Sequence, residues 1–109
     1  MIATFELLAE PTRRRILDLL RDGERPVGEL VDRLSMSQPA VSKHLRVLRE
    51  SGLVDVRVDA QRRMYRLRPE PLKEVDAWIA PYRRLWDQRL DRFERHLKTM
   101  EDAKGPEID

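Results

Sequence analysis

The stretch of sequence that decides the fold is Ser37-Gln-Pro-Ala-Val-Ser-Lys-His-Leu-Arg-Val-Leu-Arg-Glu-Ser-Gly-Leu-Val54. Three apolar residues in it, Val41, Leu45 and Leu48, recur at helical spacing, which predicts an amphipathic helix. Ser37 is a good N-cap for this helix, and Pro39 suits the first turn because a proline there gives up no hydrogen bond. A glycine ends the pattern, so the stretch encodes one helix with a buried face and a polar face.

A shorter helix precedes this one. We expect Pro26 to open it, and apolar residues then recur at helical spacing over Val27–Leu34. A three-residue break follows, and two helices joined by so short a turn form a helix-turn-helix, here predicted over residues 27–51. Further upstream, the sequence predicts a short helix within residues 1–9 and another that begins at Pro11.

After Gly52 the period of the hydrophobic pattern changes from about 3.6 to about 2 residues. Residues 53–58 alternate between apolar and polar, and residues 64–68 alternate again after a short turn, which predicts a β-hairpin over residues 53–68. A helix-turn-helix followed by a hairpin is the layout of a winged-helix domain, whose second helix enters the DNA major groove. The predicted fold is therefore mainly α with a small β-hairpin, a winged helix-turn-helix.

The polar face of the second helix carries side chains that can read bases and grip phosphates. In the first turn, the Gln38 amide can pair with adenine, and Arg46 further along can bind guanine or a phosphate. A polar face alone does not indicate DNA binding, because any surface helix shows polar residues opposite its apolar stripe. The order of the predicted elements, a helix-turn-helix followed by a hairpin, is what favours DNA binding. The candidate DNA-binding residues here are Ser37, Gln38, Pro39, Ser42, Lys43, Arg46 and Arg49.

The hairpin is rich in arginine. Its arginines either contact phosphate or pair with the nearby carboxylates of Asp55 and Asp59. The four residues in question are Arg57, Arg62, Arg63 and Arg66. We favour Arg62 and Arg63, at the tip, as DNA contacts.

Residues 71–100 form the second informative region, with a long apolar pattern near helical spacing. Pro81 lies inside it and predicts a kink or a shift of register. Four of the six aromatic residues of the chain occur there within sixteen residues, and such crowding requires a partner surface. The alternatives are that this helix folds back onto its own domain, or that a cavity among the aromatics takes a small apolar effector.

We expect helices within residues 1–9 and 71–100 to join two copies into a homodimer. The candidate interface residues are Ile2, Phe5, Leu8, Trp78, Ile79, Tyr82, Trp86, Phe93 and Leu97. Residues 1–100 are then predicted to form a single domain, and the polar residues 101–109 a flexible tail.

The stretch from Ser37 to Val54 resembles the recognition-helix signature of the ArsR family of bacterial repressors. The resemblance extends from Phe5-Glu-Leu-Leu-Ala-Glu-Pro-Thr-Arg13 through Tyr65-Arg-Leu67, roughly two-thirds of the chain. It implies a homodimeric winged-helix protein that binds an operator and dimerises through its first and last helices.

The sequence departs from the metal-sensing members of that family. Their thiolate sensors carry two cysteines separated by one residue at the start of the third helix, where this chain has Pro26 and Gly28. Their zinc and nickel sites on the last helix use several histidines and carboxylates, whereas that helix contains only His96 here. We therefore expect the metal-independent branch, with no metal site and no cofactor, and a structural role for His44.

Composition excludes further classes of protein. The chain has 109 residues, of which 39% are charged, and it has no cysteine, so thiolate catalysis, disulfides and cysteine-based metal centres are absent. It offers no glycine-rich phosphate loop and no evident partner for either histidine, so we do not expect an enzyme. No apolar run long enough to span a bilayer and no signal peptide are evident, which predicts a cytoplasmic protein without a membrane partner.

The charge distribution favours a nucleic-acid partner. The net charge is +2, but residues 1–68 carry 14 basic and 10 acidic side chains, a balance of +4. Of the 22 basic residues 18 are arginine, which suits contacts to phosphate and guanine, although a GC-rich genome gives the same bias. We predict a sequence-specific regulator that represses transcription as a homodimer on a palindromic operator of double-stranded DNA. The alternative is a dimeric ligand- or protein-interaction module with only weak, non-specific DNA binding.

Overall fold

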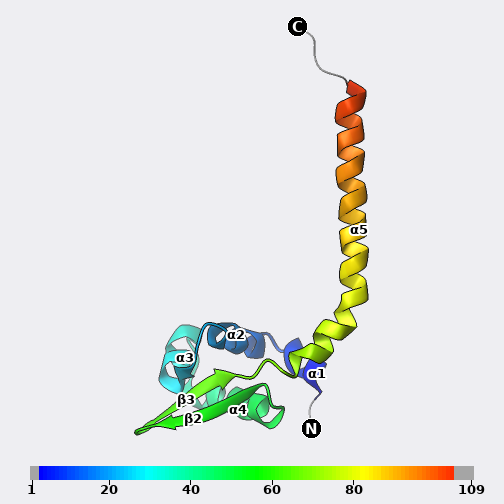
Figure 1. The fold of residues 1–109 in the computed structure, drawn as a ribbon. Coiled ribbons are helices and arrows are strands. Elements are labelled where there is room, and N and C mark those ends of the chain that lie inside the picture. The colour runs from blue at the N-terminus through cyan, green and yellow to red at the C-terminus, as the bar shows by residue number, and fades with distance from the viewer. Residues whose placement is uncertain (1–2, 105–109) are drawn as a thin grey trace. The chain divides into compact units, whose positions relative to one another are not determined.

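The computed structural model describes the backbone of residues 3–104 and the side chains of residues 3–102. Its elements, drawn in Figure 1, are α1 (Thr4–Ala9), α2 (Pro11–Leu20), β1 (Arg25–Pro26), α3 (Val27–Leu34), α4 (Gln38–Glu50), β2 (Val54–Asp59), β3 (Arg62–Leu67) and α5 (Leu72–Lys104). Contacts within the chain divide it into two units, residues 1–75 and 76–109. The single domain predicted over residues 1–100 therefore stays a prediction.

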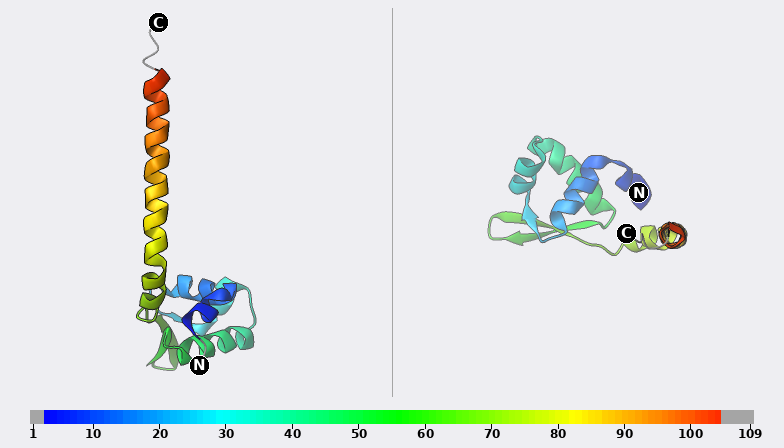
Figure 2. Two further views of the ribbon diagram at one scale, coloured as in Figure 1. Left: turned by 90° about the vertical axis from the view of Figure 1, so that its right-hand side faces the viewer. Right: turned by 90° about the horizontal axis from the view of Figure 1, so that it is seen from above.

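The first unit has one hydrophobic core, built from the apolar faces of its helices and of its sheet. In the right-hand view of Figure 2, α2, α3 and α4 lie on one side of the hairpin. Apolar residues of these helices and of the hairpin belong to one buried cluster. The fully or almost fully buried residues are Leu7, Ile16, Leu17, Leu20, Leu30, Leu34, Val41, Leu45, Leu48, Leu53, Val54 and Tyr65. Each large apolar side chain buried there stabilises the fold by about 1.5–3 kcal/mol.

The helix-turn-helix follows the prediction closely. α3 ends at Leu34, and Ser35 takes a left-handed conformation with a φ of 53°, which turns the chain toward α4. The Ser35 N–H donates to the carbonyl of Val31, so the end of α3 stays hydrogen-bonded through the turn. The mainly helical winged helix-turn-helix predicted from the sequence is confirmed.

The sheet has one strand more than the predicted hairpin. The strand order is β1-β3-β2 and both pairs are antiparallel, with Arg25 opposite Tyr65 and Pro26 opposite Met64. Pro26 was expected to open the third helix, but it lies in β1 and serves as the N-cap residue of α3. Proline is tolerated in an edge strand such as β1. The strand escaped prediction because its two residues are too few to show an alternating pattern.

The last helix extends beyond its predicted end at residue 100. α5 continues to Lys104 and passes through Pro81, so residues 101–104, which were assigned to the tail, are helical. The residue types Glu, Ala and Lys at these positions have high helix propensity, which accounts for the extension. Residues 105–109, the rest of the predicted tail, lie outside the described residues, as does Ile2 of the predicted dimer interface.

Candidate nucleic-acid interface

The local sequence fixes where α4 begins and which way it faces. The Ser37 hydroxyl accepts a hydrogen bond from the backbone N–H of Ala40 at 3.3 Å, as predicted for the N-cap, and Pro39 occupies the first turn. The side chains of Val41 and Leu45, on the apolar face of α4, are buried in the core. Because this apolar stripe holds the helix against the domain, the opposite face is directed to solvent.

All the predicted DNA-binding residues of α4 and its N-cap are exposed. They are Ser37, Gln38, Pro39, Ser42, Lys43, Arg46 and Arg49. Within the described part of the chain, no ion pair involves Lys43, Arg46 or Arg49. The structure thus brings these side chains together on one surface and leaves their positive charges uncompensated there.

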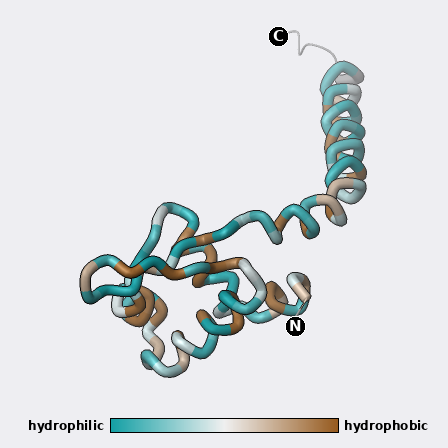
Figure 3. The backbone as a smooth tube through the Cα atoms, turned by 60° about the horizontal axis from the view of Figure 1, so that its bottom comes forward, coloured by the Kyte–Doolittle hydropathy of each residue, from teal (hydrophilic) through white to brown (hydrophobic). Residues whose placement is uncertain are grey.

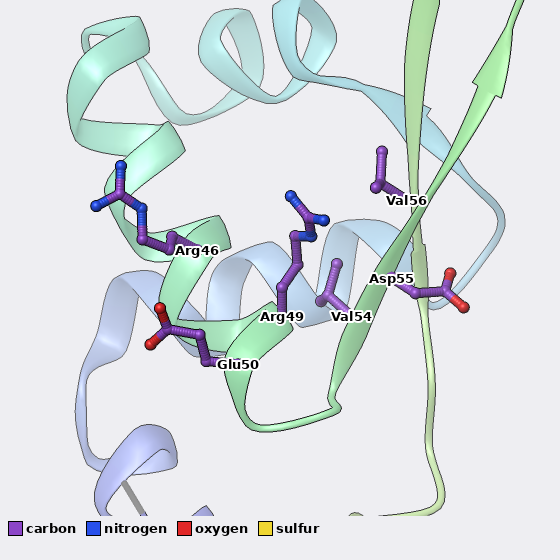
Figure 4. Close-up of a pocket in the computed structure, with 6 residues that line it drawn as sticks. All are labelled: Arg46, Arg49, Glu50, Val54, Asp55 and Val56. Carbon is purple, nitrogen blue, oxygen red and sulfur yellow. The ribbon is translucent and has the colours of Figure 1, made fainter. Parts of the chain in front are cut away.

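An open groove lies between α4 and the hairpin. It has a volume of about 510 Å³ and is lined by Arg46, Arg49, Glu50, Val54, Asp55 and Val56. Figure 4 shows Arg49 rising from α4 beside Val54 and Val56 of β2, while the carboxylate of Asp55 points away from the groove. The guanidinium groups of Arg46 and Arg49 on the α4 wall are suited to phosphate oxygens, while Glu50 adds a carboxylate to the same wall.

The structure separates the two roles proposed for the hairpin arginines. Arg57 pairs with Glu24, and its guanidinium lies 3.9 Å from Asp59. Arg66 Nε donates to Asp55 Oδ1 at 2.5 Å. These two arginines are therefore partners of carboxylates.

The two arginines at the hairpin tip behave differently. Arg62 and Arg63 are exposed and take part in no ion pair among the described residues. They remain the hairpin's candidates for contact with DNA, as the sequence predicted.

These ion pairs lower the pKa of the carboxylates that the hairpin arginines contact. The hydrogen bond from Arg66 holds the pKa of Asp55 below its ordinary value. The hydrogen bond from Arg57 likewise lowers the pKa of Glu24. Both carboxylates are therefore ionised at neutral pH, and the hairpin keeps its ion pairs under physiological conditions.

Some polar residues outside the predicted DNA-binding set make structural hydrogen bonds. Glu10 caps α2 by accepting a hydrogen bond from the Thr12 N–H at 2.9 Å, which lowers the pKa of its carboxyl group. His44 is half-buried. Arg14 donates to the carbonyl of Leu8 at 2.6 Å, so this arginine ties α2 to α1.

Most of the predicted dimer residues that the structure describes are exposed apolar side chains. On α5, Trp86 is 51% exposed and Phe93 59% exposed, and Tyr82 and Leu97 are exposed as well. The rings of Trp78 and Tyr82 lie 5.0 Å apart, centroid to centroid. Phe5 is also exposed, while Leu8 and Ile79 are half-buried.

Some exposed apolar residues were missing from the predicted sites. Leu85, Leu90 and Met100 are exposed on α5, and Val58 is exposed near the hairpin tip. Leu90 and Met100 share the helical spacing of the predicted set, which could have identified them. Val58 continues the alternation of β2, but a strand pattern does not say where the core beneath it ends.

The described residues offer neither a metal site nor a membrane-spanning helix. No group of three or more His, Cys, Asp or Glu side chains in this part of the chain could hold a metal ion. No helix in the same part has the length and apolar character required to cross a membrane.

Comparison with known proteins places this fold and surface in a family. Residues 10–56 match the family described as "Bacterial regulatory protein, arsR family". The HTH-type transcriptional regulator Rv2034 of Mycobacterium tuberculosis is 46% identical over 98 residues, which cover 90% of this chain and 89% of that protein.

Solved structures agree with the sequence comparison. The crystal structure of a "possible transcriptional regulator for arsenical resistance" aligns with a TM-score of 0.68 and 41% identity, over 88% of this chain and 97% of the other. A solution structure from Mycobacterium bovis aligns with a TM-score of 0.55 and 32% identity, over 78% of this chain and 76% of the other. That protein is described as a homodimeric winged helix-turn-helix DNA-binding domain and a possible ArsR-family regulator. The present chain belongs to the ArsR family, and it is a DNA-binding transcriptional regulator.

Proposed function

We propose that the protein represses transcription by binding a two-fold operator as a homodimer. Each copy places α4 in a major groove, and the two grooves lie about one helical turn of DNA apart, because the symmetry of the protein matches that of the site. The exposed polar face of α4, with its unpaired cations, carries this proposal. Occupancy of such a site in a promoter excludes RNA polymerase.

The residues of α4 divide into base readers and phosphate contacts. Gln38 and Arg46 have the chemistry for bidentate contact with adenine and guanine respectively, and Ser42 lies one turn from each along the same face. Lys43 and Arg49 contribute positive charge toward the phosphates. Because the N-cap hydrogen bond uses the Ser37 oxygen as acceptor, the Ser37 hydroxyl hydrogen remains available for a phosphate oxygen.

The homodimer follows from the exposed apolar side chains of α5. Aromatic residues each hide about 150–250 Å² when buried, and a surface that exposes several of them is typical of a protein–protein interface. We assign the contact to a second copy of the chain, whose own α5 offers the same surface, with α1 contributing Phe5 and Leu8.

Alanine variants at Gln38 and Arg46 test the proposal. A duplex is first enriched from a random-sequence pool by the wild-type protein, and this selected duplex is used for all binding measurements. Each variant should bind it with a free energy less favourable by about 1–3 kcal/mol, because a bidentate contact to a base is lost. Arg21→Ala is the control, because that exposed arginine lies at the end of α2 and near Asp22.

Two control measurements make a negative result interpretable. Circular dichroism and sedimentation must show that each variant keeps its fold and its association state. If both α4 variants bind the selected duplex as tightly as the wild type does, α4 does not read the operator. Function as a protein- or ligand-interaction module would then be favoured.

A further inference from the structure

A small cavity in the first unit is lined by residues of α1, of α2 and by the first residue of α5. Its volume is about 260 Å³, its apolar lining consists of Leu8, Leu17 and Leu72, and its polar lining of Arg14 and Asp18. The groove assigned to DNA, between α4 and the hairpin, shares no lining residue with it. Sites for drug-sized ligands have volumes of about 300–1,000 Å³, so this cavity suits a smaller molecule.

The two charged side chains of the cavity have no charged partner in the described part of the chain. Arg14 and Asp18 lie one turn apart on α2, at a spacing that often produces an ion pair. The Arg14 guanidinium instead donates to the Leu8 carbonyl at 2.6 Å, which fixes its position and leaves its other N–H groups available. The cavity therefore presents a positive and a negative group that are farther apart than an ion pair.

We propose that this cavity binds a small hydrophobic α-amino acid, and that this amino acid is an effector that releases the protein from DNA. The carboxylate of the ligand pairs with Arg14, its ammonium group pairs with Asp18, and its side chain packs against the three leucines. An α-amino acid carries both charges on one carbon, so it bridges a guanidinium and a carboxylate that do not meet. An apolar amine or an apolar acid would satisfy only one of these two groups.

Leu8 connects the cavity to DNA binding. This step rests on the proposed function, in which Leu8 of α1 contacts the second copy of the chain. A ligand that packs against Leu8 competes with that contact and therefore favours the separated chains. Because a two-fold operator is bound by both copies together, the ligand should lower the affinity of the protein for the selected duplex.

Four probes separate the contributions of the two charges and of the apolar side chain. L-leucine has all three, isoamylamine lacks the carboxylate, isocaproate lacks the ammonium group, and glycine lacks the side chain. The whole chain is titrated with each probe, and nitrogen–proton correlation NMR spectra report the affinity and the position of binding. L-leucine should bind about two- to fivefold more tightly than the amine or the acid, and about tenfold or more above glycine. The amide signals that should shift are those of Leu8, Leu17, Asp18 and Leu72.

Two aspartates near the end of α2 provide a matched pair of variants. Asp18 lines the cavity, whereas Asp22 is exposed and lies outside its lining. Asp18→Asn should weaken binding of L-leucine by about two- to fivefold without weakening binding of isocaproate, and Asp22→Asn should change neither. Arg14→Gln should weaken binding of L-leucine to a similar extent without weakening binding of isoamylamine.

The effect on DNA is measured by fluorescence anisotropy with the selected duplex. Saturating L-leucine should weaken binding by the wild-type protein about fivefold or more, and glycine should leave it unchanged. The inference would be overturned by absence of shifts at the cavity, by equal affinity for L-leucine and isoamylamine, by unchanged binding of L-leucine to Asp18→Asn, or by unchanged DNA affinity. If the ligand-free protein still depends on Gln38 and Arg46 to bind the duplex, the proposed function stands in each of these cases.

Discussion

Helices α4 and α5 are both amphipathic, but the apolar stripe of α4 is buried, whereas apolar side chains of α5 are exposed. The apolar stripe of α4, including Leu45 and Leu48, is buried against the core of the first unit. The stripe of α5, including Trp86 and Phe93, is about half exposed or more, and in Figure 3 apolar positions recur turn after turn along this helix. Periodicity therefore reveals that a helix has an apolar face, but not which molecule covers that face.

The largest expected loss of stability comes from a substitution at the centre of the α4 stripe. Leu45→Ala should lower the free energy of unfolding by about 2–5 kcal/mol, because it leaves a cavity in a packed core. Leu90→Ala makes the same chemical change on the exposed stripe of α5. Urea denaturation at several protein concentrations should show a loss independent of concentration for Leu45→Ala, and a loss that grows with concentration for Leu90→Ala. Concentration-independent losses at both positions would mean that α5 is covered within its own chain.

The second test removes an aromatic from α5. Trp86→Ala should weaken dimerisation by about 2 kcal/mol or more, roughly a 30-fold change in dissociation constant, because buried tryptophans dominate interfaces. Gln88→Ala, an exposed polar residue of the same helix, is the control and should leave association unchanged. Sedimentation equilibrium measures both. Equal association of the two variants would remove Trp86 from the interface.

Sequence reasoning succeeded where a local hydrophobic pattern extended over many residues. The α4 stripe extends over several turns and has a capping serine, so its helix, its N-cap and its buried face were all predictable. The hairpin was predictable because the alternation persists through both strands. By contrast, β1 spans only Arg25–Pro26 and depends on pairing with β3 far along the chain, a contact that no local pattern contains.

The partners of the hairpin arginines were beyond sequence reasoning for a similar reason. The pairing of Arg57 with Glu24 joins residues 33 positions apart, so it emerges only once the sheet has formed. Arg66 and Asp55 are joined by the strand register, which depends on the length of the turn. Local patterns identified the charged residues, but the fold decided which of them remain available for DNA.

The third test separates the two roles of Ser37 at the start of α4. Ser37→Ala should destabilise the protein by about 0.5–2 kcal/mol, because the cap to the Ala40 N–H is lost. Ser37→Asp should retain most of the stability, since aspartate is also a good N-cap, but it should weaken DNA binding by repelling phosphate. Thermal unfolding and binding to the selected duplex measure the two effects. Unimpaired DNA binding by Ser37→Asp would place this end of α4 away from the duplex.

The smallest effect concerns the outer face of the hairpin. Arg66 lowers the pKa of Asp55 in the folded state. The ionised carboxylate therefore stabilises the fold at pH values above its unfolded-state pKa of about 4. This stabilisation is lost as the pH falls through the lower pKa of the folded state. Asp55→Asn should therefore be less stable than the wild type at pH 7, by a difference that shrinks below about pH 4. Asp32→Asn, an exposed aspartate of α3, is the control. A difference that stays constant down to low pH would show that the Asp55 carboxylate is not stabilised by its charge.

Sedimentation velocity on the selected duplex tests most directly whether two copies joined through α5 present their α4 faces to one DNA site. The wild-type protein should bind with two chains per duplex. Trp86→Ala should lose specific affinity at concentrations where it is monomeric, although its α4 is unchanged. A wild-type complex with one chain per duplex at full specific affinity, or a monomeric Trp86→Ala that binds as tightly as the wild type, would contradict the account.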